Sequence, residues 1–112
     1  FQNALCTVST SHEEGFGMVL PESLSCGTPV VATKSGGVAD IVKHGKNGFL
    51  VDYDENQISS SILQICREKS LRESFSICGR RHVEESFSID VIGTKILTEY
   101  KKYLGKNAIK DI

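Results

Sequence analysis

Three short runs rich in apolar and β-branched residues alternate with segments long enough for a helix, and this alternation limits the folds open to the chain. The runs cover residues 4–8 (ALCTV), 29–33 (PVVAT) and 48–51 (GFLV). Between them lie residues 18–26 (MVLPESLSC) and 38–44 (VADIVKH), each followed by a glycine, as is common where a helix ends. Strands separated by helices require crossover connections, so we expect parallel pairing in an α/β sheet.

The second half of the chain has helical spacing instead. Apolar residues recur at intervals of three and four positions, which predicts helices over residues 55–70, 71–86 and 89–103. Asp54 or Asn56 is a candidate cap for the first of these. The last predicted helix carries its apolar residues on one side: Val91, Ile92, Ile96, Leu97 and Tyr100. The predicted fold is a partial Rossmann-like domain with about three parallel strands, flanking helices and a helical C-terminal tail.

Length and charge limit the classes of partner. A chain of 112 residues is long enough for one core, so residues 1–112 are interpreted as one domain fragment. Its 13 basic and 14 acidic side chains give a net charge of -1, which excludes the electrostatic footprint of a nucleic-acid-binding protein. No signal peptide and no apolar run of about 18 residues is present, so we expect no transmembrane segment, and the cysteines described below favour a cytoplasmic protein. The strand-like start without an initial methionine indicates a piece of a longer protein.

The four cysteines are widely spaced, at Cys6, Cys26, Cys66 and Cys78. They form no CxxC pair and no cysteine–histidine cluster with metal-ligand spacing, so the sequence predicts no metal site. We interpret them as reduced residues of the core, where a free cysteine packs as a small apolar side chain.

The stretch EGFGMVLPE, residues 14–22, places two glycines and a helix start between two carboxylates. In a parallel sheet it would lie at the carboxyl edge, where ligands bind. The first turn of a helix offers unpaired N–H groups and partial positive charge to a phosphate, and Gly15 and Gly17 would let the ligand approach the backbone. Glu14 and Glu22 would repel phosphate, so we expect them to bind neutral hydroxyl groups. The motif therefore predicts a sugar-nucleotide site.

Residues 11–51 resemble the signature segment of the retaining GT-B glycosyltransferases of group 1, also called family 4. The matching features, in order, are the two glutamates eight positions apart, the segment CGTPVVAT, the pair Gly36-Gly37 and the strand NGFLV. The tail from Phe87 to Tyr100 resembles the closing segment of the family more loosely.

The resemblance implies roles for the matching residues. Glu14 would be the catalytic residue at the transferred sugar, as a nucleophile or as a stabiliser of positive charge, and Glu22 would hydrogen-bond the ribose. The backbone lining the donor sugar and diphosphate would come from Gly15, Phe16, Gly17, Met18 and Val19. The implied reaction is retaining transfer from a nucleoside diphosphate sugar, such as a UDP- or GDP-sugar, to a glycan, lipid-linked or small-molecule acceptor, without a metal or other cofactor.

The resemblance also implies that parts of the enzyme lie elsewhere. The acceptor-binding domain and the Arg and Lys that hold the diphosphate in this family would precede the chain, so we expect the isolated fragment to be inactive and to self-associate through an open sheet edge. Peripheral contact of the full enzyme with the cytoplasmic face of a membrane stays open. Lys34 and Asp40 depart from the family's usual residues.

Alternatives remain beside this interpretation. A non-catalytic nucleotide-sugar or carbohydrate-binding module would keep the fold, although both glutamates are present here. A nucleotide-sugar epimerase would show a glycine fingerprint after its first strand, and none occurs. His12 is a weaker candidate for acid–base chemistry than Glu14, and Gly36-Gly37 fits either a turn or a ligand-facing loop.

Overall fold

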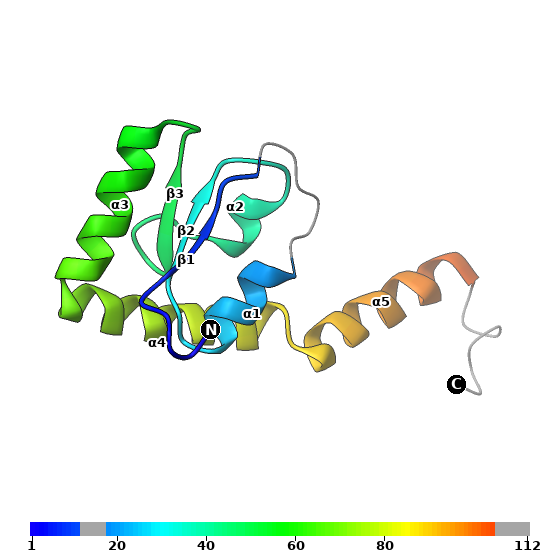
Figure 1. Cartoon of the computed structure of the whole chain (residues 1–112). Helices are drawn as coiled ribbons and strands as arrows, with labels where there is room; N and C mark the ends of the chain where they lie inside the picture. Colours follow the sequence, from blue (N-terminus) through cyan, green and yellow to red (C-terminus); the bar gives the residue numbers. More distant parts are fainter. Residues whose placement is uncertain (12–17, 105–112) are drawn as a thin grey trace.

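A three-stranded parallel sheet forms the centre of the protein (Figure 1). The computed structural model describes residues 1–11 and 18–104. The strands are β1 (Thr7–Ser9), β2 (Val30–Thr33) and β3 (Gly48–Val51), side by side in that order. Both pairings are parallel, with Thr7 opposite Val30 and Val30 opposite Gly48. The predicted α/β fold is confirmed.

Five helices accompany the sheet in the described part of the chain. The short crossovers contain α1 (Val19–Ser25) and α2 (Val38–Ile41). The C-terminal half consists of α3 (Glu55–Arg67), α4 (Lys69–Ser86) and α5 (Ile89–Leu104).

The ends of three helices follow from specific residues. At α3 the side chain of Asp54 accepts a hydrogen bond from the Asn56 N–H, which settles the choice of cap. The Ser88 hydroxyl accepts from the Val91 N–H at the start of α5. Gly27 follows α1 with a φ of 77°, a left-handed conformation that favours glycine.

The central strand β2 is buried on both faces, as expected for parallel strands between helical layers. On one face a cluster joins β2 to α1 and α2: Leu20, Leu24, Val30, Ala32, Val38, Ile41 and Val42. On the other face a second cluster joins β2 and β3 to α3 and α4: Val31, Val51, Ile65 and Phe75. Gly79 of α4 lies so close to Leu24 that an added Cβ would be 2.8 Å from Leu24 Cδ2, so α4 can also pack against α1.

Several predicted elements have different bounds; the boundary between the helices predicted over 55–70 and 71–86 lies earlier, since α3 ends at Arg67 and α4 begins at Lys69. The first strand, predicted over residues 4–8, begins only at Thr7. Before it, the Ala4 N–H donates to the Phe1 carbonyl in a turn, and the first hydrogen bond to the neighbouring segment is from the Thr7 N–H to the Pro29 carbonyl. The helix expected over residues 38–44 ends at Ile41. The buried Asn47 side chain donates a hydrogen bond to the Ile41 carbonyl and accepts one from the Lys43 N–H. These backbone groups are therefore not available for further helical hydrogen bonds, and the helix ends.

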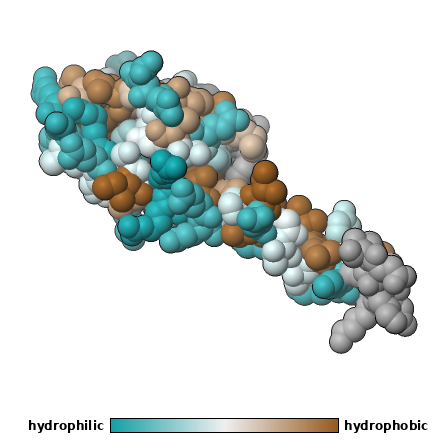
Figure 2. Space-filling view, turned by 90° about the horizontal axis from the view of Figure 1, so that it is seen from below, coloured by the Kyte–Doolittle hydropathy of each residue, from teal (hydrophilic) through white to brown (hydrophobic). Residues whose placement is uncertain are grey.

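The C-terminal helix α5 extends away from the body of the protein (Figure 1). None of its residues is buried, and of the apolar side chains predicted to share one side only Val91 is half-buried; Ile96 is 51% exposed and Tyr100 57%. Figure 2 shows apolar residues gathered along this helix and where it meets the body. The helical tail is confirmed, but the packing that its amphipathic pattern indicates has no counterpart among the described residues.

The four cysteines are free, as predicted, but none of them is buried, so the prediction that they are core residues is wrong. Cys26 and Cys66 are exposed, while Cys6 and Cys78 are half-buried. Cys26 lies at the C-cap of α1, and Cys66 lies near the end of α3 beside the Cys6 thiol. Within residues 1–11 and 18–104, no helix has the length and apolar character needed to cross a membrane.

Candidate functional site

The carboxyl ends of the three parallel strands bring distant parts of the sequence to one edge of the sheet. Residues 10–11 leave β1 there, Lys34 to Gly37 leave β2, and Asp52 leaves β3. The first turn of α1 points toward the same edge, since its C-terminal end is joined to the start of β2 by only a few residues. This edge is where open parallel sheets bind ligands.

The first turn of α1 presents three of the predicted site residues to solvent. Met18 and Val19 are 59% and 50% exposed, and Glu22 is exposed on the same turn. Leu20 and Pro21 of this turn are buried and fix it to the core. Met18, the N-cap residue, makes no side-chain capping hydrogen bond. The helical ladder begins with the bond from the Glu22 N–H to the Met18 carbonyl, so the N–H groups of Met18, Val19 and Leu20 precede it and could face an anionic ligand.

The other predicted site residues, Glu14, Gly15, Phe16 and Gly17, lie outside the described residues, as does His12. Their roles and their distances to Glu22 stay predictions.

A buried hydroxyl fixes α1 relative to the sheet. Ser23 Oγ lies 2.8 Å from Thr7 Oγ1 and 3.0 Å from the Thr28 carbonyl oxygen. Ser23 is fully buried, so these contacts compensate for the loss of its water. They join α1, β1 and the entry to β2, which holds the exposed first turn in a defined position.

A second buried hydroxyl holds the chain that leaves β1. Thr33, 2% exposed at the end of β2, donates through Oγ1 to the Ser11 carbonyl at 2.8 Å; Oγ1 lies 3.5 Å from the Ser9 carbonyl. The sequence analysis missed this role. The only signal was a hydroxyl residue at the end of an otherwise apolar, buried strand.

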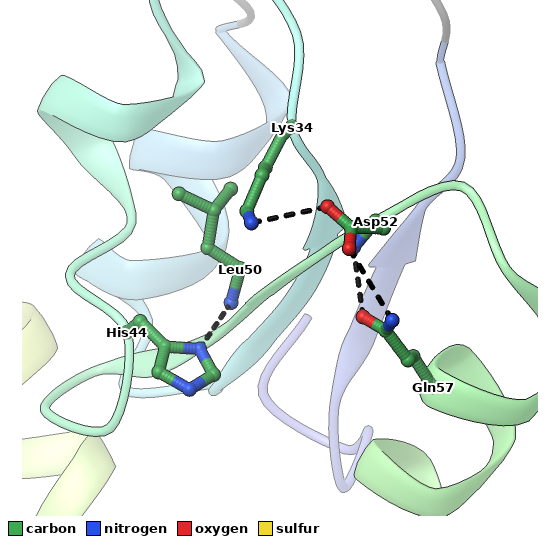
Figure 3. A network of polar contacts seen from close by, with 5 residues as sticks. All are labelled: Lys34, His44, Leu50, Asp52 and Gln57. Carbon is green, nitrogen blue, oxygen red and sulfur yellow. Dashed lines mark hydrogen bonds and ion pairs between the residues drawn. The ribbon is translucent and has the colours of Figure 1, made fainter.

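Charged residues from β2 and β3 meet at the same edge (Figure 3). Lys34 Nζ lies 3.0 Å from Asp52 Oδ1, and Gln57 of α3 donates to the other carboxylate oxygen at 3.3 Å. The hydrogen bonds from Lys34 and then Gln57 hold the pKa of Asp52 below its ordinary value, with the charge of Lys34 adding to the effect. Both ion-pair partners are about 60% exposed, so the pair adds little stability. Lys34, which departs from the family pattern, is therefore engaged within the chain.

The pair Gly36-Gly37 forms the turn into α2. Gly36 has a φ of 44°, and Gly37 is the N-cap of α2. These features support the turn interpretation, although Gly36 is also exposed at the carboxyl edge of the sheet. Next to it the Ser35 hydroxyl is buried and makes no hydrogen bond to the described residues.

A groove of about 560 Å³ lies beside the first turn of α1. Its lining is almost entirely apolar and comes from the first turn of α1, the residue after α4, and α5: Met18, Pro21, Phe87, Ile89, Ile92, Gly93 and Ile96. Over the described residues, no three His, Cys, Asp or Glu side chains lie close enough together to hold a metal ion.

Comparison with known proteins identifies the family. Residues 1–82 match the family described as Glycosyl transferases group 1. The chain belongs to this family. The match covers all three strands and the first turn of α1, which are the elements that form the candidate site.

Relatives of this group 1 chain include enzymes of several pathways. It is 33% identical over 105 residues to the capsular polysaccharide biosynthesis glycosyltransferase CapM of Staphylococcus aureus, covering 93% of this chain and 28% of CapM. Sucrose-phosphate synthase from Thermosynechococcus elongatus has a similar structure, with a TM-score of 0.79 and 29% identity over 88% of this chain and 25% of that one. HepE of Anabaena, solved in complex with UDP-glucose, gives a TM-score of 0.71 and 30% identity over 87% of this chain and 28% of HepE.

The group 1 chain is therefore much shorter than these proteins. It spans about a quarter of the length of curated relatives that it matches.

Proposed function

We propose that the protein containing this chain transfers a sugar from a nucleoside diphosphate sugar to an acceptor, with retention of configuration. The observation that carries the proposal is the exposed first turn of α1, with Glu22, at the carboxyl edge of the parallel sheet. The chain that forms this sheet belongs to the group 1 glycosyl transferases. The donor class is supported by HepE, a similar structure that was solved with UDP-glucose. The acceptor class is a glycan, a lipid-linked sugar or a small molecule.

In this proposal the two glutamates have different tasks. Glu22, on the first turn of α1, hydrogen-bonds the ribose hydroxyls, and the backbone N–H groups of Met18 and Val19 face the diphosphate. Glu14 faces the transferred sugar, where positive charge develops as the bond to the leaving phosphate breaks. Gly15, Phe16 and Gly17 complete the donor-binding backbone. The reaction as proposed uses no metal or other cofactor.

The isolated 112-residue chain should not catalyse transfer. Positioning of both substrates supplies a large part of any transfer rate, and the acceptor site of this family belongs to another domain. Turnover of a nucleotide sugar by the purified chain alone would contradict this expectation.

The test separates the two glutamates in the full-length protein. Binding of UDP and GDP is measured by calorimetry and sugar transfer by product formation, for Glu14→Gln and Glu22→Gln in parallel. Glu22→Gln should weaken binding of the free nucleotide by about 1.5–3 kcal/mol, the contribution of charge-assisted hydrogen bonds. Glu14→Gln should lower turnover with little change in nucleotide affinity, because its contribution belongs to the transition state.

Glu85→Gln is the matched control, since Glu85 is an exposed glutamate of α4 outside the candidate site. It should leave both quantities unchanged. Loss of nucleotide binding in Glu14→Gln, or normal binding and turnover in Glu22→Gln, would show that the roles are wrongly assigned. Nucleotide binding without any transfer by the wild-type full-length protein would favour a non-catalytic binding module.

A further inference from the structure

Two thiols from distant parts of the sequence meet on one face of the sheet. Cys6 directly precedes β1, and Cys66 is the last residue but one of α3. The two side chains are hydrogen-bonded to each other. Cys6 also packs against the second apolar cluster, which joins the sheet to α3 and α4. Folding therefore holds the start of β1 against the end of α3.

Neighbouring contacts keep this pair of thiols in place. The second cluster contains Ile65, the residue before Cys66, and Ile65 is 0% exposed. Arg72 of α4 donates through one guanidinium nitrogen to the Ile65 carbonyl at 2.8 Å and to the Cys66 carbonyl at 2.9 Å, which fixes the last turn of α3. A disulfide places its sulfur atoms about 2.05 Å apart, so two thiols already in hydrogen-bond contact need only a small approach to form one.

The two thiols differ in their access to solvent. Cys66 is exposed, whereas Cys6 is half-buried. A soluble oxidant therefore reaches Cys66 first. The Cys6 thiol beside it can then react with the oxidised Cys66 sulfur, which favours a reversible disulfide over further oxidation of Cys66.

We propose that Cys6 and Cys66 form a reversible disulfide in the presence of a peroxide, and that this bond fastens the start of β1 to α3. The Cys66 thiolate attacks one peroxide oxygen, so that an S–O bond forms, the O–O bond breaks and the released hydroxide takes up a proton as water. Cys6 then loses its proton and attacks the Cys66 sulfur, so that the S–S bond forms and the S–O bond breaks. The departing hydroxide takes up that proton as a second water molecule. In sum, two thiols and one hydrogen peroxide give one disulfide and two water molecules.

The expected consequence is a more stable attachment of β1. In the described part of the chain β1 pairs on one side only, with β2, over Thr7–Ser9. A bond between Cys6 and Cys66 would close a long loop and so restrict the unfolded chain, which stabilises the folded state. The inference is independent of the proposed sugar transfer.

The test compares four forms of the full-length protein: wild type, Cys6→Ser, Cys66→Ser and Cys26→Ser. Cys26→Ser is the matched control, because it removes an exposed cysteine at the C-cap of α1. Each reduced protein is treated with hydrogen peroxide, its remaining thiols are alkylated, and peptides made without reductant are identified by mass spectrometry. A second sample contains dimedone, which traps sulfenic acid. Thermal unfolding is measured before oxidation, after it, and after addition of dithiothreitol.

Most wild-type and Cys26→Ser molecules should yield a peptide that links Cys6 to Cys66, and dithiothreitol should remove the link. Oxidation should raise their unfolding temperature by at least about 3 °C, and dithiothreitol should reverse the rise. Cys6→Ser should give no link and a dimedone adduct on Cys66, whereas Cys66→Ser should give no link and leave Cys6 reduced. If Cys6→Ser fails to fold, Cys6→Ala takes its place with the same expectations.

Absence of the linked peptide in wild type would overturn the inference. Links of Cys66 to Cys26 or Cys78 as frequent as its link to Cys6, or a link between two chains through Cys66, would also overturn it. Equal unfolding temperatures of oxidised and reduced wild type would refute the fastening of β1. None of these outcomes depends on sugar transfer, so the proposed function would stand in each case.

Discussion

At the scale of single residues, buried polar side chains hold loops against the sheet. Asn47 is 1% exposed, and its amide accepts from the Lys43 N–H and donates to the Ile41 carbonyl. It thereby joins the end of α2 to the start of β3. Thr33 and Ser23 do the same around β1 and α1. Unpaired, these buried groups would each cost about 1–3 kcal/mol, so the contacts select one loop geometry.

Gly48 is predicted to tolerate no side chain. A Cβ at this position would lie 2.1 Å from the Val30 carbonyl oxygen, which is backbone of the neighbouring strand. Gly48→Ala should therefore destabilise the 112-residue chain by about 1–3 kcal/mol or more, measured by urea unfolding. The control is Gly93→Ala in α5, where nothing lies within 4 Å and alanine should stabilise the helix by up to about 1 kcal/mol. Equal stability of wild type and Gly48→Ala would refute the strand contact.

Cys6 is predicted to ionise only at high pH. Burial, followed by the charge and hydrogen bonding of the neighbouring Cys66 thiol, raises the pKa of Cys6. Because the thiolate is the reactive form, alkylation of Cys6 should accelerate at a higher pH in the folded than in the denatured protein. Mass spectrometry after timed alkylation gives the two profiles.

The variant Cys66→Ser should move the Cys6 profile in the folded protein toward lower pH. Identical profiles in folded and denatured wild type would contradict the assigned cause. Titration of the denatured protein without reductant should count four thiols, since all four cysteines are free.

At the scale of elements, α3 and α5 show that the same amphipathic pattern leads to different packing. Both place isoleucines at helical spacing, yet Ile65 of α3 is 0% exposed against β2 and β3 whereas Ile96 of α5 is 51% exposed. The difference lies in what each helix meets. The turn after β3 returns α3 to the sheet, while α5 runs beyond it (Figure 1).

The substitutions Ile65→Ala and Ile96→Ala test this difference with one residue type. In the 112-residue chain, Ile65→Ala should cost about 2–5 kcal/mol of unfolding free energy, because it leaves a cavity in the core. Ile96→Ala should change it by no more than about 0.5 kcal/mol. Chemical denaturation followed by circular dichroism measures both. A cost for Ile96→Ala near that of Ile65→Ala would mean that α5 is packed.

At the scale of the whole molecule, the sheet ends at β1 on one side. Among residues 1–11 and 18–104, β1 pairs with β2 and nothing pairs with its outer edge. Val8 on this strand is 42% exposed and Leu5 before it 50%. An apolar edge strand of this kind offers unpaired backbone groups to another chain.

The 112-residue chain is therefore predicted to self-associate through β1. Its mass by light scattering should rise with concentration, and Val8→Lys should lower it, because a charge on an edge strand opposes pairing. Leu63→Lys is the control, a substitution of a half-exposed apolar residue on α3. A monomer at all concentrations would contradict the prediction, and an equal effect of Leu63→Lys would indicate general apolar association instead.

The sequence by itself determined the alternation of strands and helices and the parallel pairing of the strands. These follow from local patterns: a buried run such as PVVAT needs helices on both faces, and a glycine such as Gly27 ends a helix through its left-handed backbone. The family resemblance, confirmed over residues 1–82, rests on the same contiguous segments.

Only the tertiary structure decided which side chains from distant segments meet. Three contacts illustrate this: the hydrogen bond from Thr33 to the Ser11 carbonyl, the ion pair of Lys34 with Asp52, and the hydrogen bond from Asn47 to the Ile41 carbonyl. Such contacts do not follow a sequence periodicity, so the sequence pattern could not predict them. The exposure of α5 was also invisible, because a helical pattern shows that an apolar side exists but not what covers it.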